Sequence, residues 1–292
     1  MSLILFGAGL AYHFATLKLF NALVPKDTYT ELLGNDVAYG PDDRQKLDVY
    51  SPSHVTAQLP ILLFVYGGSW KEGSRGDYEF AGRTFAARGY LTLVMDYRLS
   101  PDHPFPAFVE DVASAISWAE KEGPRFGGDP QRIFAVGHSA GAYNLALAIL
   151  DRHYLEKAGV DPSALRAVAT LAGPFDFLPL DTKATIATFG DVLDLATTQP
   201  INYARADAPP LLLLTGTDDT TVYPKNSRAL EKALKERGAL VELREYQGVG
   251  HVGILLALAK PFRSQTTPVI EDMIAFFAKH DAPKPKTNCS QN

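Results

Sequence analysis

Residues 132–141 read Arg-Ile-Phe-Ala-Val-Gly-His-Ser-Ala-Gly, and residues 142–150 continue as Ala-Tyr-Asn-Leu-Ala-Leu-Ala-Ile-Leu. The apolar run 133–136 predicts a buried strand, and the stretch 142–150 predicts a helix. Between them, Gly-His-Ser-Ala-Gly fits the pattern G-x-S-x-G. A serine on such a tight strand-to-helix turn exposes its hydroxyl above the sheet edge, beside the N-terminal amides of the helix. The segment therefore predicts an α/β fold with Ser139 as a nucleophile.

Apolar runs alternate with helix-forming stretches through the middle of the chain. The runs that predict strands are residues 35–40, 45–50, 59–66, 91–97, 133–136, 165–172, 209–216 and 241–246. The stretches that predict helices are residues 76–88, 105–122, 142–150, 224–237 and 268–279. Buried strands that alternate with helices form a mostly parallel sheet with helices on both faces. We therefore expect a twisted eight-stranded sheet, in which the first hairpin adds an antiparallel edge at the N-terminal side.

The chain has 292 residues, which is enough for one large α/β domain. We expect this domain to span residues 26–280, with a small cap formed by the irregular insertion 174–208 and a flexible tail at 281–292. The N-terminal residues 1–25 are largely apolar, and we expect a helix there. Three interpretations of residues 1–24 stay open, namely a lid helix packed on the domain, a helix lying on a membrane surface, and a degenerate signal or anchor.

Composition narrows the classes of partner and cofactor. The formal net charge is −5 and no basic stripe is present, so we expect no nucleic-acid partner. The single cysteine, Cys289, allows no disulfide within the chain and no thiolate metal site. We expect no metal and no organic cofactor. A cytoplasmic location is favoured, membrane association and export stay open, and the oligomeric state is not indicated.

A serine hydroxyl is a poor nucleophile at neutral pH, so it needs a base within hydrogen-bond reach and an acid that orients the base. Asp218 and Asp219 follow the predicted strand 209–216, and His251 follows the predicted strand 241–246. Open α/β sheets place their ligand sites at these strand ends. We therefore expect His251 to act as the base and Asp219 as the acid, because the pattern Gly-x-x-Asp-x-x-Val at 216–222 favours Asp219. Asp218 stays the alternative.

The oxyanion of an acyl-transfer intermediate needs main-chain donors aimed at it. The loop after the predicted strand 59–66 reads Gly-Gly-Ser-Trp at residues 67–70. Consecutive glycines let backbone N–H groups approach a substrate oxygen without obstruction by a side chain. We expect the N–H groups of Gly68, Ser69 and Ala140 to form the oxyanion hole.

Several motifs together identify a family. They are Tyr-Gly-Gly-Ser-Trp at 66–70, Asp-Tyr-Arg-Leu-Ser-Pro at 96–101, Phe-Pro at 105–106, Gly-Gly-Asp-Pro-Gln-Arg-Ile at 127–133, the elbow at 137–141, the acid loop at 216–222 and Gly-His at 250–251. With them, from about residue 34 to 279, the chain resembles the α/β-hydrolases. Within that fold it resembles the short carboxylesterases of the hormone-sensitive-lipase and acetyl-xylan or feruloyl esterase type.

The resemblance has one departure, because Tyr66 stands where the family has a histidine. That histidine usually braces the glycine loop, so the resemblance implies that Tyr66 braces it differently, through its phenol. The resemblance also implies that the segment around Arg98 and the carboxylate of Asp111 are structural and pair near this loop.

The resemblance implies hydrolysis of small-molecule esters, with short- to medium-chain or aryl groups, through an acyl-enzyme. We expect an apolar substrate pocket lined by Trp70, Tyr143, Phe175, Phe177 and Val252. Two alternatives stay open. An arylformamidase-type amide hydrolase shares the glycine loop and the same three catalytic residues, and a non-catalytic α/β-hydrolase would serve as a binding protein.

Overall fold

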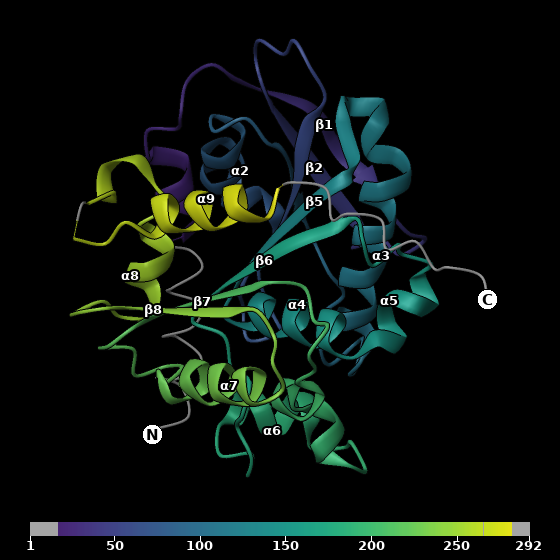
Figure 1. Cartoon of the computed structure of the whole chain (residues 1–292), viewed down its shortest axis with the longest axis vertical. Helices are drawn as coiled ribbons and strands as arrows, with labels where there is room; N and C mark the ends of the chain where they lie inside the picture. Colours follow the sequence, from purple (N-terminus) through teal and green to yellow (C-terminus); the bar gives the residue numbers. More distant parts are fainter. Residues whose placement is uncertain (1–16, 265, 282–292) are drawn as a thin grey trace.

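An eight-stranded sheet runs through the middle of the computed structural model, which describes residues 17–264 and 266–281 (Figure 1). The strands are β1 (Thr30–Ala38), β2 (Lys46–Pro52), β3 (Leu59–Val65), β4 (Leu91–Met95), β5 (Gly128–His138), β6 (Leu165–Leu171), β7 (Leu211–Gly216) and β8 (Val241–Tyr246). Their order in the sheet is β1-β2-β4-β3-β5-β6-β7-β8. β2 is antiparallel to both β1 and β4, and the remaining pairs are parallel. The predicted mostly parallel sheet with an antiparallel N-terminal edge is confirmed.

The central strands are buried along their whole length. Every residue of β4, β6 and β7 is buried, as are the last five residues of β3. Parallel strands covered by helices on both faces need apolar side chains on both faces, which is why these segments read as continuous apolar runs. The outer strands β1 and β8 are partly exposed and carry mixed polar and apolar residues.

Helices cover both faces of the sheet (Figure 1). One face carries α2 (Glu79–Ala86) and α9 (Val269–His280), and the other carries α3 (Ala107–Glu122), α4 (Ala140–Leu150), α5 (Arg152–Ala158) and α7 (Lys225–Glu236). All eleven residues of α4 are buried, because α4 packs on β5 while α3 and α5 pack against it. The helix that follows the elbow is therefore fixed from several sides.

Two helices and two strand boundaries differ from the sequence prediction. The structure adds α5 and α8 (His251–Leu256), which have 7 and 6 residues and are too short for a reliable helical period. β1 begins at Thr30 rather than at residue 35, and β5 extends over Gly128–His138 rather than 133–136. The added parts of β1 and β5 lack the apolar pattern, and their strand conformation comes from pairing with β2 and β3.

The insertion 174–208 holds α6 (Lys183–Phe189) and two short turns of 3-10 helix, η3 (Leu195–Thr198) and η4 (Pro200–Tyr203). A reciprocal capping box between Thr182 and Thr185 starts α6. η4 packs on α4 and α7. This insertion therefore lies beside the helix that follows Ser139, at the carboxyl-end side of the sheet.

The described part of the N-terminal region packs on the domain. Residues 17–23 are helical, and the Phe20 ring lies 5.4 Å from that of Phe80 and 5.7 Å from that of Phe262. Asn21 donates to the carbonyl of Gly76 and accepts from the N–H of Phe80. Within the described residues, no helix is long and apolar enough to cross a membrane. Residues 1–16 lie outside the described residues, and so does the predicted tail 281–292 except for Asp281, which pairs with Arg132.

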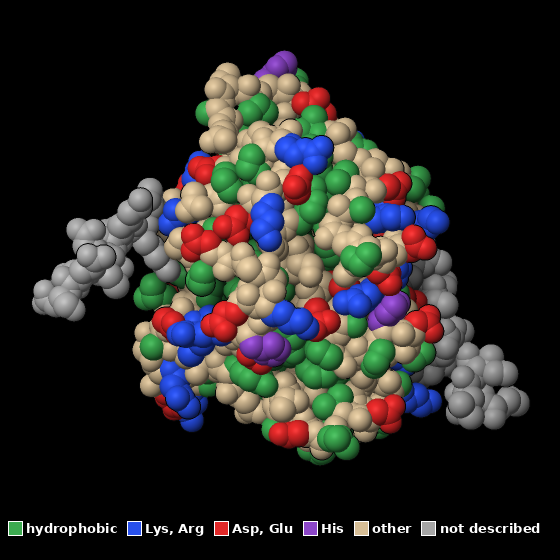
Figure 2. Space-filling view, turned by 90° about the vertical axis from the view of Figure 1, so that its right-hand side faces the viewer, with side chains coloured by type: hydrophobic (Ala, Val, Ile, Leu, Met, Phe, Trp, Pro, Cys, Tyr) green, Lys and Arg blue, Asp and Glu red, His purple; other side chains and the backbone are tan. Residues whose placement is uncertain are grey.

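Charged side chains of both signs are intermixed on the face formed in part by α3 and α5 (Figure 2). Ion pairs contribute to this pattern, including Lys157 with Glu110 from α5 to α3. Apolar side chains on this face are scattered between the charges rather than gathered in one patch (Figure 2).

Candidate active site

Ser139 occupies the turn between β5 and α4 with φ 53° and ψ −122°, a conformation that non-glycine residues rarely adopt. The flanking glycines make this turn sterically possible. A β-carbon on Gly141 would lie 2.2 Å from the carbonyl oxygen of Val65 and 2.3 Å from that of Tyr66. A β-carbon on Gly137 would lie 2.7 Å from the backbone of α4. The elbow therefore requires both glycines because backbone passes directly against backbone.

Ser139, His251 and Asp219 form a continuous hydrogen-bonded chain. The Ser139 Oγ lies 2.8 Å from His251 Nε2, and His251 Nδ1 lies 2.8 Å from Asp219 Oδ2. The other carboxylate oxygen of Asp219 accepts the N–H groups of Thr221 and Val222 at 2.9 and 2.8 Å. Asp219 is buried, and these two amides hold its carboxylate toward the imidazole. The arrangement can deprotonate a serine hydroxyl and stabilise the resulting imidazolium.

The structure distinguishes the two neighbouring acids. Asp218 is exposed, and its carboxylate accepts a hydrogen bond from the hydroxyl of Thr217 at 3.0 Å. Only Asp219 of the two contacts His251. His251 itself is the first residue of the short helix α8, which follows β8. Gly250 is the N-cap of this helix, so the imidazole projects from the helix start.

His138, the variable residue of the elbow, lies beneath the base. Its Nε2 is 3.3 Å from the main-chain oxygen of His251, and the two rings are 5.0 Å apart. Its Nδ1 is buried and has no hydrogen-bond partner among the described residues. Burial, together with the nearby His251, lowers the pKa of His138 from 6.5 to about 3. The ring is therefore neutral, with its proton on Nε2 and donated to the His251 carbonyl.

This buried histidine should make the fold sensitive to acid. The unfolded chain takes up a proton on this side chain below about pH 6.5, whereas the folded state does so only near pH 3. The contribution of the neutral ring to the free energy of unfolding is therefore fully present above pH 6.5 and is lost as the pH falls toward 3. We expect the free energy of unfolding, measured in urea, to fall between about pH 7.5 and 5 by about 2 kcal/mol more in the wild type than in His138→Gln. Equal losses in the two proteins would contradict this assignment.

The glycine loop carries two of the three amides expected for an oxyanion hole, and it lies against the serine. A β-carbon on Gly67 would be 2.7 Å from the Ser139 Cβ, so the glycine loop touches the nucleophile. Among the described residues, none accepts a hydrogen bond from the N–H of Gly68 or Ser69. Ala140 is the first residue of α4, where N–H groups have no partner within the helix. All three groups are therefore available to a substrate oxygen.

An aromatic cluster fills the space between the glycine loop, α4 and the insertion. The Trp70 ring lies 5.1 Å from Tyr143 and 4.9 Å from Phe189, and Tyr143 lies 5.7 Å from Phe177. Trp70 also donates its indole N–H to Asn144 at 2.9 Å. Phe189, on α6, was not expected here, since a single aromatic residue on a short helix gives no local signal of its partner. The insertion is thus packed against the loop through aromatic rings.

The five expected pocket residues differ in exposure. Tyr143 and Phe175 have no exposed surface, and Trp70 is 3% exposed. These three belong to the core beneath the site, and they present no open wall to a ligand in this conformation. Phe177 is half-buried and Val252, next to His251, is 46% exposed. Of the five, only these last two offer appreciable surface to a substrate.

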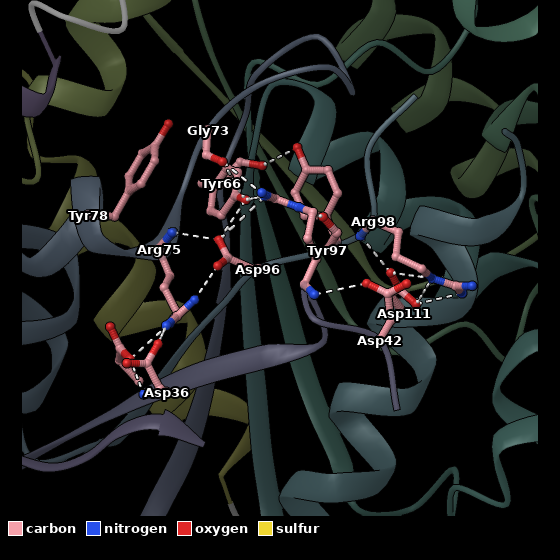
Figure 3. A network of polar contacts seen from close by, with 12 residues as sticks. Asp36, Asp42, Tyr66, Gly73, Arg75, Tyr78, Asp96, Tyr97, Arg98 and Asp111 are labelled. Atoms are coloured by element: carbon pink, nitrogen blue, oxygen red, sulfur yellow. Dashed lines mark hydrogen bonds and ion pairs between the residues drawn. The ribbon is translucent and has the colours of Figure 1, made fainter. Parts of the chain in front are cut away.

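The expected pairing of Arg98 with Asp111 is confirmed. The Arg98 N–H and Nε donate to the fully buried Asp111 carboxylate at 2.7 and 2.9 Å. A second polar network behind the glycine loop was not foreseen, and it joins Tyr66 to Asp96 and Arg75 (Figure 3). Its members come from separate segments, so no spacing in the sequence links them.

Within the part of the chain that the structure describes, no group of three or more His, Cys, Asp or Glu side chains could hold a metal ion. The hydrogen-bonded serine, histidine and aspartate meet beside the glycine loop.

The family model described as BD-FAE matches residues 47–234, more than half of the chain. The chain belongs to the BD-FAE family. This BD-FAE protein is 27% identical over 286 residues to the probable isoprenylcysteine alpha-carbonyl methylesterase ICMEL1 of Oryza sativa, with 90% of this chain and 67% of the relative covered. It is 32% identical over 236 residues to esterase LipC of Mycobacterium tuberculosis, with 74% and 58% covered. The chain thus spans about three fifths to two thirds of these relatives.

Solved structures share the fold of this BD-FAE protein. Esterase B from Lactobacillus rhamnosis superposes with a TM-score of 0.82 at 20% identity, with 94% of this chain and 93% of that chain covered. A thermostable esterase from Pseudomonas putida superposes with a TM-score of 0.76 at 21% identity, with 94% and 91% covered. The expected α/β-hydrolase fold is confirmed, and the matched proteins named above are esterases.

Proposed function

We propose that this chain hydrolyses carboxylic esters through an acyl-enzyme formed on Ser139. The observation that carries the proposal is the hydrogen-bonded chain from Ser139 Oγ through His251 to Asp219, with 2.8 Å at each of its two contacts. Esterases among the relatives support the same reaction class.

In the first half-reaction, Ser139 Oγ attacks the ester carbonyl carbon while its proton passes to His251 Nε2. The carbonyl oxygen becomes an oxyanion, and the N–H groups of Gly68, Ser69 and Ala140 are the donors proposed to bind it. Collapse of this intermediate breaks the bond to the alcohol, which leaves with the proton from His251. Water then repeats the sequence, and the carboxylic acid leaves while Ser139 regains its proton.

Asp219 sets the proton position on His251. Its carboxylate accepts from Nδ1–H, which leaves Nε2 as the acceptor facing the serine. Because Asp219 Oδ1 is held by two backbone N–H groups, the carboxylate cannot turn away from the imidazole without breaking them. The buried charge also stabilises the imidazolium that forms when Ser139 is deprotonated.

Removal of the nucleophile should abolish the reaction. We expect Ser139→Ala to reduce turnover of p-nitrophenyl acetate and butyrate by about 10⁶, because the nucleophilic hydroxyl is removed. A fluorophosphonate probe should label the wild type and fail to label the variant. Retention of more than a small fraction of the activity by Ser139→Ala would reject the acyl-enzyme on this residue.

Asp219→Asn and Asp218→Asn form a matched pair. In Asp219→Asn the side-chain oxygen keeps the two backbone donors, so the amide NH₂ faces His251 Nδ1 and forces the proton onto Nε2. A histidine protonated on Nε2 cannot accept the serine proton, and we expect kcat to fall by about 10⁴. The exposed Asp218→Asn should keep kcat within about twofold. Comparable losses in both variants would contradict the assignment of the acid.

We propose short- to medium-chain or aryl esters as the substrates. Trp70, Tyr143 and Phe175 fill the volume beneath the glycine loop, which leaves Phe177 and Val252 as apolar surface near the serine. A site with so little open apolar wall favours a small acyl group.

A series of p-nitrophenyl esters from acetate to dodecanoate tests the substrate class. We expect kcat/KM to be highest with a short or medium acyl chain and to decline toward dodecanoate. A maximum at dodecanoate would contradict a small acyl site. Faster turnover of N-formylkynurenine than of every ester would instead favour an amide hydrolase of the arylformamidase type.

A further inference from the structure

The glycine loop between Tyr66 and Gly73 has a strained backbone. Ser69 and Trp70 adopt φ values of 51° and 60°, in the left-handed region that disfavours side chains. Such a strained conformation persists only when the surroundings of the residue determine it. The contacts that hold this loop therefore decide where the N–H groups of Gly68 and Ser69 point.

The ring of Tyr66 is fixed at the base of this loop. It lies between Tyr78, with centroids 5.1 Å apart, and Tyr97, with centroids 4.9 Å apart. Gly73, where the loop ends, presses on the same ring, because a β-carbon there would lie 2.5 Å from Tyr66 Cε2. The ring of Tyr66, the residue at the start of the loop, therefore contacts Gly73 at its end (Figure 3).

The hydroxyl of Tyr66 joins the loop to two charged groups. It lies 2.8 Å from Asp96 Oδ1 and 3.1 Å from the carbonyl oxygen of Gly73, and it accepts from Arg44 Nη2 at 2.7 Å. Arg44 Nη2 also donates to the Gly73 carbonyl at 3.0 Å. A phenol has one proton, so we assign it to Asp96, the shorter contact and the charged acceptor. Burial, with Asp96 beside it, raises the pKa of Tyr66 well above 10, so the hydroxyl keeps this proton.

Asp96 is anchored independently of Tyr66. Its carboxylate accepts the backbone N–H of Arg75 at 2.7 Å and forms an ion pair with the Arg75 side chain. Arg75 in turn pairs with Asp48 on β2 at 2.9 Å. The Tyr66 hydroxyl therefore links the start of the loop to a carboxylate that the sheet already holds (Figure 3).

We propose that Tyr66 is a positioning residue for the oxyanion donors. It acts through its hydroxyl, which donates to Asp96 and accepts from Arg44, the side chain that also holds the Gly73 carbonyl. This inference rests on the proposed ester hydrolysis at Ser139. The hydroxyl holds the amides of Gly68 and Ser69 in line with the developing oxyanion and does not contact the substrate. Its loss should therefore weaken binding of the transition state more than binding of the substrate.

Tyr66→Phe tests the role, and Tyr39→Phe is the matched control. Tyr39 is also a buried tyrosine, and its hydroxyl donates at 2.6 Å to the main-chain oxygen of the same Asp96. Among the described residues, it forms no hydrogen bond with the loop. We expect Tyr66→Phe to lower kcat for p-nitrophenyl butyrate about tenfold with KM within about twofold, since misaligned donors lose part of the oxyanion stabilisation. Tyr39→Phe should lower the free energy of unfolding in urea about as much as Tyr66→Phe does, and it should change kcat by less than about twofold.

Arg44→Met provides a second variant, because Arg44 is partly exposed and donates to both Tyr66 and Gly73. We expect it too to lower kcat more than it changes KM. The inference is overturned if Tyr66→Phe and Arg44→Met both keep wild-type kcat, or if Tyr39→Phe lowers kcat as much as Tyr66→Phe does. The test of Tyr66 and the test of ester hydrolysis can fail independently of each other. Ester hydrolysis that is lost in Ser139→Ala and unchanged in Tyr66→Phe rejects only the role of Tyr66.

Discussion

The close approach of the α4 N-terminus to the carboxyl end of β3 is the constraint on which the rest of the structure depends. At Gly141 the helix backbone passes so near the carbonyls of Val65 and Tyr66 that not even a methyl group fits. This contact places Ser139 against the loop that β3 leads into. The strained φ of 53° at Ser139 is held by the same packing, because α4 is buried on every side. The nucleophile and the amide donors therefore share one rigid junction.

The sheet order brings the remaining groups to that junction. β5 leads to Ser139, β7 to Asp219 and β8 to His251, and all three strands are parallel. Their carboxyl ends therefore lie along one edge, although 80 residues of sequence separate Ser139 from Asp219. His138 contacts the main-chain oxygen of His251, the first residue of α8. A buried neutral histidine beneath a base also keeps a second positive charge away from the imidazolium.

Most features that depend on local sequence pattern were predicted correctly, whereas several features that depend on contacts between distant residues were not. The buried strands were predictable because burial on both faces leaves a continuous apolar run, as in β6 and β7. The helices α5 and α8 were not, since their short lengths carry little periodicity. Trp70, which the sequence suggested as a pocket residue, is a core residue because three further aromatic rings from α4 and the insertion surround it.

The sequence by itself determined the fold class, the elbow and the order of Ser139, Asp219 and His251, because these depend on local steric rules and on strand succession. Only the tertiary structure decided that Asp219 rather than Asp218 contacts His251, because one faces inward and its neighbour is exposed. It alone also decided how Tyr66 is held, since Arg44, Gly73 and Asp96 reach that hydroxyl from three different segments. Side-chain contacts between distant segments arise from packing in three dimensions, and no residue spacing records them.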